Sequence, residues 1–125
     1  MTLRRLLLVL AGGTIGTAAR LALGMLLPDR GFPWAILLAN VAGALLIGVV
    51  AARLPGSTDL RVFLGTGLLG GFTTYSAFMT GTWSLAADAP LVAGAYAIGS
   101  LVLGLAAAAC GLRLGRRRRP AEATA

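Results

Sequence analysis

The sequence predicts an all-α integral membrane protein with four transmembrane helices and a break in the third. Of its 125 residues, 58% are hydrophobic and only 12% are charged, and the mean hydropathy is +0.87. Soluble domains contain about 25% charged residues. Four apolar stretches, residues 6–27, 32–52, 62–87 and 91–112, are each long enough to cross about 30 Å of hydrocarbon. We therefore expect residues 1–125 to form one membrane domain with a basic tail at residues 113–125.

The first apolar stretch follows Arg4 and Arg5, a pattern that also begins secretory signal peptides. However, the stretch continues to Leu27 and is interrupted only by Arg20, so its length favours a helix that is retained. Proline, glycine and charged residues then mark three short connections, at residues 28–31, 53–61 and 88–90. Short connections predict that the four helices alternate in direction.

The third apolar stretch contains four glycines within residues 65–71, followed by Thr73 and Thr74. Each glycine costs about 1 kcal/mol of helix propensity relative to alanine. The run therefore predicts an interrupted helix, whose free carbonyls would hold an ion or border a pore. The alternative is that the glycines allow close helix packing, as in the pair Gly67 and Gly71.

Few polar side chains lie inside the spans, and each has two interpretations. Asn40 could make an interhelical hydrogen bond or donate to an ion in a pore. Arg20 could extend to the membrane interface or attract an anion. Tyr96 and Ser100, four residues apart on one helical face, form either a hydroxyl track or a packing seam.

Missing residue types exclude several classes of protein. The sequence has no histidine, and its acidic residues all fall in connections or in the tail. Proton-coupled carriers need a carboxylate or histidine inside the membrane, so we do not expect one, nor do we expect an enzyme. The formal charge of +7 suits anionic lipid better than nucleic acid. The function class that remains is a passive path through the membrane for a small anion.

Three motifs resemble those of the Fluc or CrcB fluoride channel family, and the resemblance covers essentially the whole chain. They are GGTIGTAAR at residues 12–20, LANVAG at residues 38–43, and GLLGGFTTYSAF at residues 67–78. The resemblance implies a dimer of two antiparallel subunits, with two fluoride paths and one structural sodium ion at the helix breaks.

By the same resemblance, the backbone carbonyls of Gly70 and Thr73 would bind the sodium ion. The fluoride path would be lined by Asn40, Tyr75, Phe78, Tyr96 and Ser100. The chain departs from the family pattern at three positions. Tyr75 replaces a phenylalanine, Gly81 replaces a common acidic residue, and Gly104 replaces a third hydroxyl in the track.

The resemblance implies passive efflux of fluoride from the cytoplasm across the inner membrane, which lowers fluoride toxicity. Charge complicates the assembly. Nine arginines fall on the side of the membrane that carries both termini and the second connection, and one falls on the opposite side. This bias predicts cytoplasmic termini. The bias favours a heterodimer with an oppositely oriented paralogue over a dual-topology homodimer. The alternative function is therefore that of a non-conducting or half-conducting subunit, which completes a heterodimeric fluoride channel with that paralogue.

Overall fold

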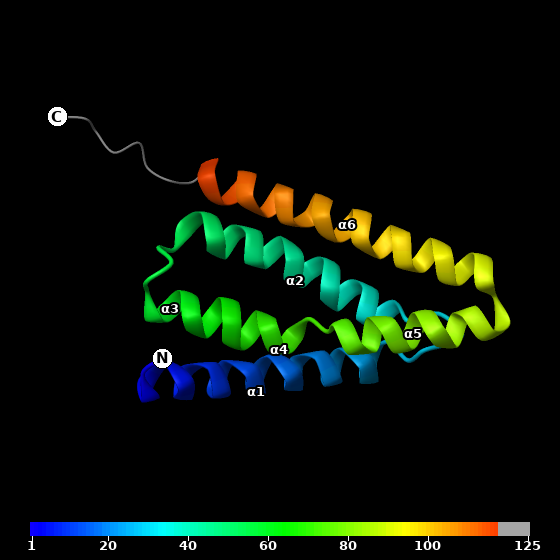
Figure 1. Ribbon diagram of the computed structural model, residues 1–125, viewed down its shortest axis with the longest axis horizontal. Helices are drawn as coiled ribbons and strands as arrows, with labels where there is room; N and C mark the ends of the chain where they lie inside the picture. Colours follow the sequence, from blue (N-terminus) through cyan, green and yellow to red (C-terminus); the bar gives the residue numbers. More distant parts are fainter. Residues whose placement is uncertain (118–125) are drawn as a thin grey trace.

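A computed structural model of the chain describes residues 1–117, and these residues form helices joined by short connections, without strands. Among the described residues, four helical segments are long and apolar enough to cross a membrane: Leu3–Leu26, Trp34–Arg53, Asp59–Asp88 and Pro90–Arg116. The helices are α1 (Leu3–Leu26), α2 (Trp34–Arg53), α3 (Asp59–Arg61), the π-helix η1 (Val62–Leu69), α4 (Gly70–Phe72), α5 (Tyr75–Asp88) and α6 (Pro90–Arg117). The third apolar segment thus comprises α3, η1, α4 and α5 (Figure 1).

The helices run lengthwise, so that the connections gather at two ends (Figure 1). The N-terminus, the α2–α3 connection and the last turns of α6 lie at one end, here called the basic end. Its arginines among the described residues are Arg4, Arg5, Arg53, Arg61, Arg113, Arg116 and Arg117. The α1–α2 and α5–α6 connections lie at the opposite end, here called the acidic end after Asp29 and Asp88.

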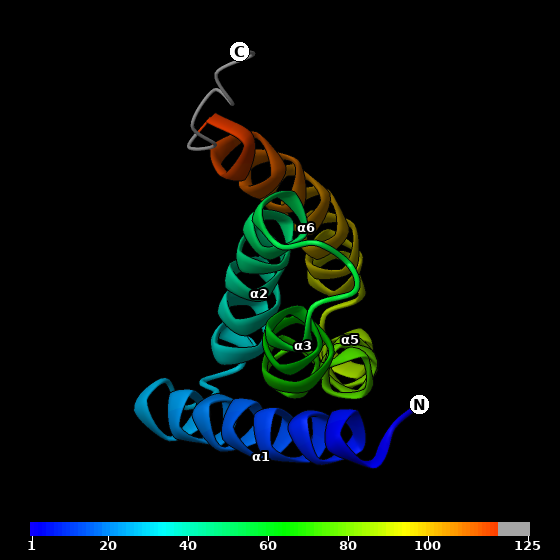
Figure 2. The same cartoon turned by 90° about the vertical axis from the view of Figure 1, so that its left-hand side faces the viewer.

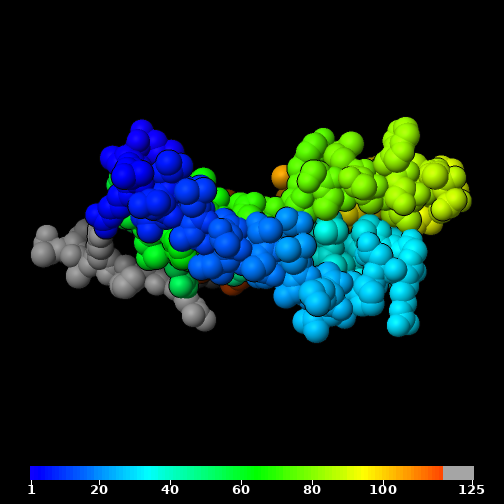
Figure 3. Space-filling model, turned by 90° about the horizontal axis from the view of Figure 1, so that it is seen from below, coloured from blue at the N-terminus to red at the C-terminus, as the bar shows by residue number. Residues whose placement is uncertain are grey.

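Two pairs of segments make the main packing contacts. α2 packs along α6, whereas α1 lies across η1 and α4 (Figure 2). Seen from the α1 side, α1 covers η1 and α4 and leaves α5 uncovered (Figure 3). The third segment therefore has different neighbours along its length, since α5 packs mainly on α6.

Glycines bring the backbones of α1 and η1 into contact. A Cβ atom built on Gly12 would lie 2.6 Å from the Phe63 carbonyl oxygen, and one on Gly16 would overlap the Leu68 carbonyl oxygen. A Cβ atom on Gly71 would overlap the Gly13 carbonyl oxygen. This is the close packing of small residues that membrane helices use. The packing interpretation of the glycine run therefore describes η1 and α4 well.

Residues 65–71 stay helical, and two residues with extended backbone follow α4. Thr73 has φ −81° and ψ 155°, and Thr74 has φ −150° and ψ 124°. The hydroxyl of Thr74 accepts a 3.2 Å hydrogen bond from the Ala77 N–H and so caps α5. We call these two residues the extended pair.

The last helix is longer than the sequence predicted. α6 continues to Arg117, five residues beyond the expected end at residue 112, so that Arg113 and Arg116 lie on the helix. The rest of the predicted basic tail, residues 118–125, lies outside the described residues.

Candidate functional site

Thr74, the second residue of the extended pair, is held by Asn40, from the N-terminal half of α2. The Asn40 Nδ2 donates to the Thr74 carbonyl oxygen at 3.0 Å, and the Asn40 Oδ1 accepts from the Thr74 N–H at 2.8 Å. Both backbone polar groups of Thr74 are thus paired by one side chain. The interhelical hydrogen bond that was one interpretation of Asn40 is present, and the second N–H of the amide adds one more donor to the site.

This pairing changes the hydrogen bonds at the end of α4. In a continuous helix the Thr74 N–H would donate to the Gly70 carbonyl, four residues earlier. Here it donates to Asn40, so the Gly70 carbonyl lacks its usual intrahelical donor. The Leu69 carbonyl, in contrast, accepts from both the N–H and the hydroxyl of Thr73, each at 2.9 Å.

The next carbonyl of α4, that of Gly71, accepts from α1. The Thr17 hydroxyl and the Arg20 Nε each lie 3.4 Å from the Gly71 oxygen. The structure therefore directs Arg20 towards the C-terminal end of α4, where a helix favours positive charge. Arg20 is half-buried in this position.

Gly70 and Thr73, the two residues assigned to sodium, line one cavity of about 390 Å³. The cavity lies between α2 and the η1–α4 segment, and Asn40 also contributes to its wall. A sodium ion takes oxygen ligands. A carbonyl without its intrahelical donor is such a ligand, so the residues present fit the ion.

A second cavity, of about 230 Å³, brings together four of the five residues assigned to the fluoride path. Its wall includes Asn40, Tyr75, Phe78 and Ser100, from α2, α5 and α6. The Tyr75 and Phe78 rings have their centroids 6.1 Å apart. Phe78 is buried, whereas Tyr75 is 75% exposed and forms the outer part of the aromatic pair.

Tyr96, the fifth residue assigned to the fluoride path, lies next to Phe78 and Ser100, two residues of the wall of this cavity. Its ring centroid lies 5.5 Å from that of Phe78, and Ser100 lies four residues along the same helix. The Tyr96 hydroxyl and the Ser100 Oγ are both buried, and neither makes a hydrogen bond to any described residue. A buried polar group without a partner costs about 1–3 kcal/mol. Such a pair indicates a place for water or a polar ligand.

The three departures from the family pattern lie in different surroundings. The Tyr75 ring remains beside Phe78. A Cβ atom on Gly81 would lie 3.7 Å from the Tyr96 hydroxyl and 3.3 Å from Pro33 Cγ. One on Gly104 would have no atom within 4 Å, so a third hydroxyl of the track is replaced by open space at this position.

Comparison with known proteins identifies the family. The profile of the family described as CrcB-like protein, Camphor Resistance (CrcB), matches residues 7–112. The chain belongs to the CrcB-like family. It is 44% identical over 117 residues to the "Fluoride-specific ion channel FluC" of Agrobacterium fabrum (strain C58 / ATCC 33970), covering 87% of this chain and 94% of that protein.

Two further CrcB-like relatives carry the same name. The protein of Paracoccus denitrificans (strain Pd 1222) is 44% identical over 113 residues, which is 86% of this chain and 91% of the relative. The protein of Thermus thermophilus is 42% identical over 120 residues, 90% and 96% of the two chains. These relatives are named as channels rather than enzymes.

Sequence reasoning missed two neighbours of the site in this CrcB-like chain. The rings of Phe32 and Tyr96 form a T-shaped pair with centroids 5.3 Å apart, and the Thr17 hydroxyl reaches the Gly71 carbonyl. Phe32 directly precedes Pro33 at the start of a span, which marks it as an interfacial aromatic. Thr17 lies three residues before Arg20, on the same helical face.

Proposed function

We propose that the chain forms a fluoride channel through which the ion leaves the cytoplasm passively. The observation that carries this proposal is the buried Tyr96 hydroxyl and Ser100 Oγ, unpartnered among the described residues, beside Phe78. Membership of the CrcB-like family and the name shared by its relatives support it. The inner membrane is the proposed location, and lower fluoride toxicity is the proposed benefit.

Fluoride is small and strongly hydrated, so a selective path must replace its water with other donors. Hydroxyls and a side-chain amide can donate, and the positive edges of aromatic rings can face an anion. The proposed path uses Asn40, Tyr75, Phe78, Tyr96 and Ser100. The interior of the spans contains no carboxylate or histidine to relay protons, since Asp59 and Asp88 lie at the two ends of the third segment. We therefore expect flux down the electrochemical gradient without proton coupling.

Efflux from liposomes that contain only the purified chain tests this function. Loaded with fluoride, such liposomes are expected to release it when an ionophore balances the charge, whereas liposomes loaded with chloride retain their ion. The chain alone could fail to release fluoride, and release could begin once a paralogue is added. This outcome would favour the alternative, in which the chain is half of a heterodimeric channel. Retention in both cases would contradict both.

The proposed structural cofactor is one sodium ion at the centre of an antiparallel dimer. The Gly70 and Thr73 carbonyls of two subunits would hold it, and the Gly70 carbonyl without its usual intrahelical donor supports this assignment. Such a site depends on backbone shape. We therefore expect Gly70→Val to disrupt assembly or transport, because a β-branched side chain restricts the backbone. Wild-type transport by this variant would argue against the site.

Charge favours the heterodimer as a second candidate assembly. The basic end has seven arginines among the described residues, whereas the described connections of the acidic end have one, Arg30. In the sequence, Arg118 and Arg119, which lie outside the described residues, add to the basic side. Positive charge near helix ends sets orientation, so one orientation is expected for nearly every copy.

Labelling of a single cysteine in the C-terminal tail of intact cells, with Cys110 replaced, measures this orientation. Labelling from the cytoplasmic side alone is the expected result. Substantial labelling from both sides would restore the dual-topology homodimer.

A further inference from the structure

Phe32, Pro33 and Trp34 form a tight turn at the start of α2. Pro33 has φ −81° and ψ 66°, and the Trp34 N–H donates to the Phe32 carbonyl at 2.9 Å. These are the features of an inverse γ-turn. The proline ring restricts the φ angle of Pro33 and also restricts the backbone of the residue before it. The direction in which Phe32 leaves the α1–α2 connection is therefore set by this turn.

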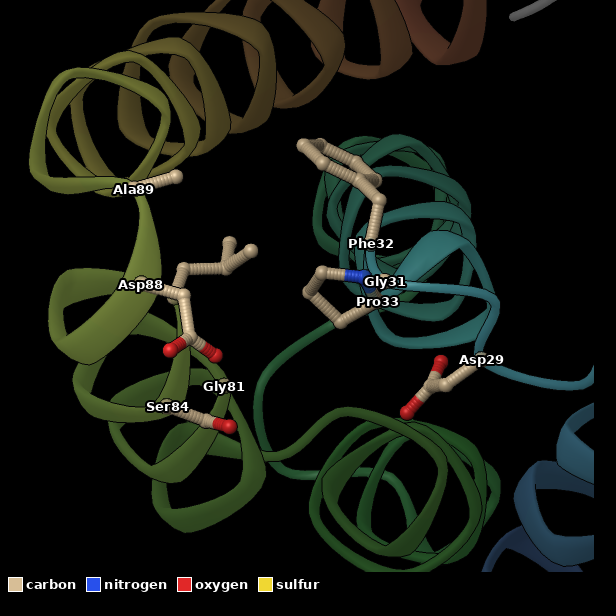
Figure 4. A pocket seen from close by; sticks show the side chains of 9 residues that line it. Asp29, Gly31, Phe32, Pro33, Gly81, Ser84, Asp88 and Ala89 are labelled. Carbon is tan, nitrogen blue, oxygen red and sulfur yellow. The ribbon is translucent and has the colours of Figure 1, made fainter.

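The turn contacts two different helices. Pro33 is buried, and a Cβ atom on Gly81 of α5 would lie 3.3 Å from the Pro33 Cγ. Phe32 is half-buried, and its ring forms a T-shaped pair with Tyr96 of α6, with centroids 5.3 Å apart and planes at 87°. Figure 4 shows the Pro33 ring directed towards α5 and the Phe32 side chain directed towards α6. The turn thus places an aromatic ring against Tyr96 while Pro33 rests on α5.

Packing, rather than hydrogen bonding, holds the Tyr96 ring. Its hydroxyl has no hydrogen-bond partner among the described residues, although the side chain is buried. The hydroxyl lies on the long axis of the ring, so its position follows from the direction in which neighbouring atoms hold that axis. Among the described residues, Tyr96 pairs with the rings of Phe32 and Phe78, whose centroids are 5.3 Å and 5.5 Å away. Phe32 is in turn packed against Trp34, with ring centroids 4.5 Å apart.

We propose that Phe32 is a positioning residue that fixes the direction of the Tyr96 hydroxyl in the ion path. This inference rests on the proposed fluoride path, in which Tyr96 and Phe78 have a part and Phe32 has none. An aromatic pair prefers an edge-to-face geometry because the positive edge of one ring meets the negative face of the other. A leucine would fill much of the same space without this preference. The contribution of the ring is therefore separable from that of its volume by Phe32→Leu.

Fluoride release measures the contribution of the Phe32 ring. In the liposome assay we expect Phe32→Leu to slow release by about two- to tenfold, the population ratio that corresponds to the loss of one aromatic pair. Phe32→Tyr keeps the ring, and the two cavities that border Phe32 leave room for a hydroxyl, so release close to the unmodified rate is expected. Phe63→Leu is the control, because Phe63 is also half-buried but forms no ring pair with any described residue.

Two outcomes of this assay would overturn the inference and leave the proposed function intact. The first is release from the Phe32→Leu variant at the rate of the Phe63→Leu control. The second is equally slow release from Phe32→Leu and Phe32→Tyr, because the ring would then have no effect of its own. Thermal unfolding in detergent, followed for all three variants, shows how much of each protein is folded, so that release is compared per folded chain.

A spectroscopic measurement does not depend on fluoride transport. The sequence has two tyrosines, so a chain with Tyr75→Phe and with fluorotyrosine in place of tyrosine reports on Tyr96 alone by fluorine NMR. We expect Phe32→Leu to add signals to those of this parent chain, or to broaden them, because the Tyr96 ring then takes more than one direction. Phe63→Leu should add none. An unchanged number and width of signals in Phe32→Leu, even at shifted positions, would show that Tyr96 keeps one direction without Phe32. This outcome would overturn the inference even where the unmodified chain releases no fluoride and the proposed function fails.

Discussion

Two regions of the molecule are packed differently. Where α1 crosses η1, the two backbones are in direct contact, whereas side chains and cavities lie between α5 and its neighbouring segments. At the first interface, a Cβ atom on Gly12 or Gly16 would collide with carbonyl oxygens of η1. At the second, Phe78 and Tyr96 pack ring against ring, and two buried hydroxyls have no partner among the described residues. The same apolar segment of the chain takes part in both, before and after the extended pair.

The difference shows how a short membrane chain can combine rigidity with a polar site. Lipid tails give no hydrophobic drive for helix association, so close contact between small residues supplies it. That contact is concentrated at η1 and α4 and along the basic-end half of α2 and α6, where Cβ atoms on Gly48 and Gly111 would overlap carbonyl oxygens of the facing helix. The acidic-end half is less tightly packed, and it contains the buried hydroxyls and the cavity of the proposed fluoride path.

The largest effect is expected from a side chain placed in the backbone contact. Gly16→Val puts its Cβ atom onto the Leu68 carbonyl and close to the Phe72 N–H. Overpacking costs about 1–3 kcal/mol and occasionally more, and here the overlap is with backbone atoms, so we expect little folded protein. Thermal unfolding in detergent, followed by circular dichroism, measures the loss. Gly24→Val on the same helix, with no atom within 4 Å, is the control; equal stability of the two variants would show that the contact does not hold the fold.

The next effect is expected at Asn40, which joins the two regions through Thr74. Asn40→Asp, when ionised, keeps the acceptor for the Thr74 N–H but turns a carboxylate oxygen towards the Thr74 carbonyl. We expect fluoride flux to be abolished and the free energy of unfolding to fall by about 1–3 kcal/mol, while a dimer persists in detergent. Normal fluoride flux from liposomes with this variant would show that Asn40 has a structural role and does not take part in permeation.

A smaller effect of opposite sign is expected at the buried hydroxyls. Ser100→Ala and Tyr96→Phe each remove a buried group that lacks a described partner, so the free energy of unfolding should rise by about 1 kcal/mol while fluoride flux falls. Thr82→Val is the control, because the Thr82 hydroxyl donates to the Phe78 carbonyl at 2.8 Å and its loss gives no such gain. Lower stability together with full flux would identify the two hydroxyls as ordinary packing groups.

The smallest effect is expected at the surface of the basic end. Asp59 lies 3.0 Å from Arg4 and 3.1 Å from Arg5 in two ion pairs, and the side chains are 31%, 79% and 38% exposed. Exposed pairs contribute about 0.5 kcal/mol, so Asp59→Asn should lower the unfolding free energy slightly at low salt and leave flux unchanged. A loss of fluoride flux in Asp59→Asn would show that the ion pairs at the basic end affect the proposed ion path, contrary to the expected independence of the two regions.

Much of the outline could be read from the amino-acid sequence. Hydropathy separates four apolar stretches, and residues 1–117 contain four helical segments suited to crossing a membrane. The motif of residues 67–78 indicates the family to which the chain belongs. These features are local, because they depend on runs of residue types and on spacing along a single helix.

The sequence did not determine which partners the polar residues would choose. Asn40 had two interpretations because helical spacing places it on a face without naming the neighbouring chain segment, and the residue it binds, Thr74, lies 34 positions away. Arg20 likewise turns to the Gly71 carbonyl, a partner 51 positions away. The glycine run remained ambiguous because close packing and helix breaking favour the same residue type.

The amino-acid sequence by itself determined the membrane class, the apolar segments, the unequal charge of the two ends and the residue types available for an anion. The tertiary structure decided that η1 and α4 stay helical against α1, that the backbone becomes extended at Thr73 and Thr74, and that Gly81 lies beside the Tyr96 hydroxyl. The physical reason is that helix propensity acts within one turn, whereas the approach of two backbones and the pairing of a freed N–H depend on how separate helices cross.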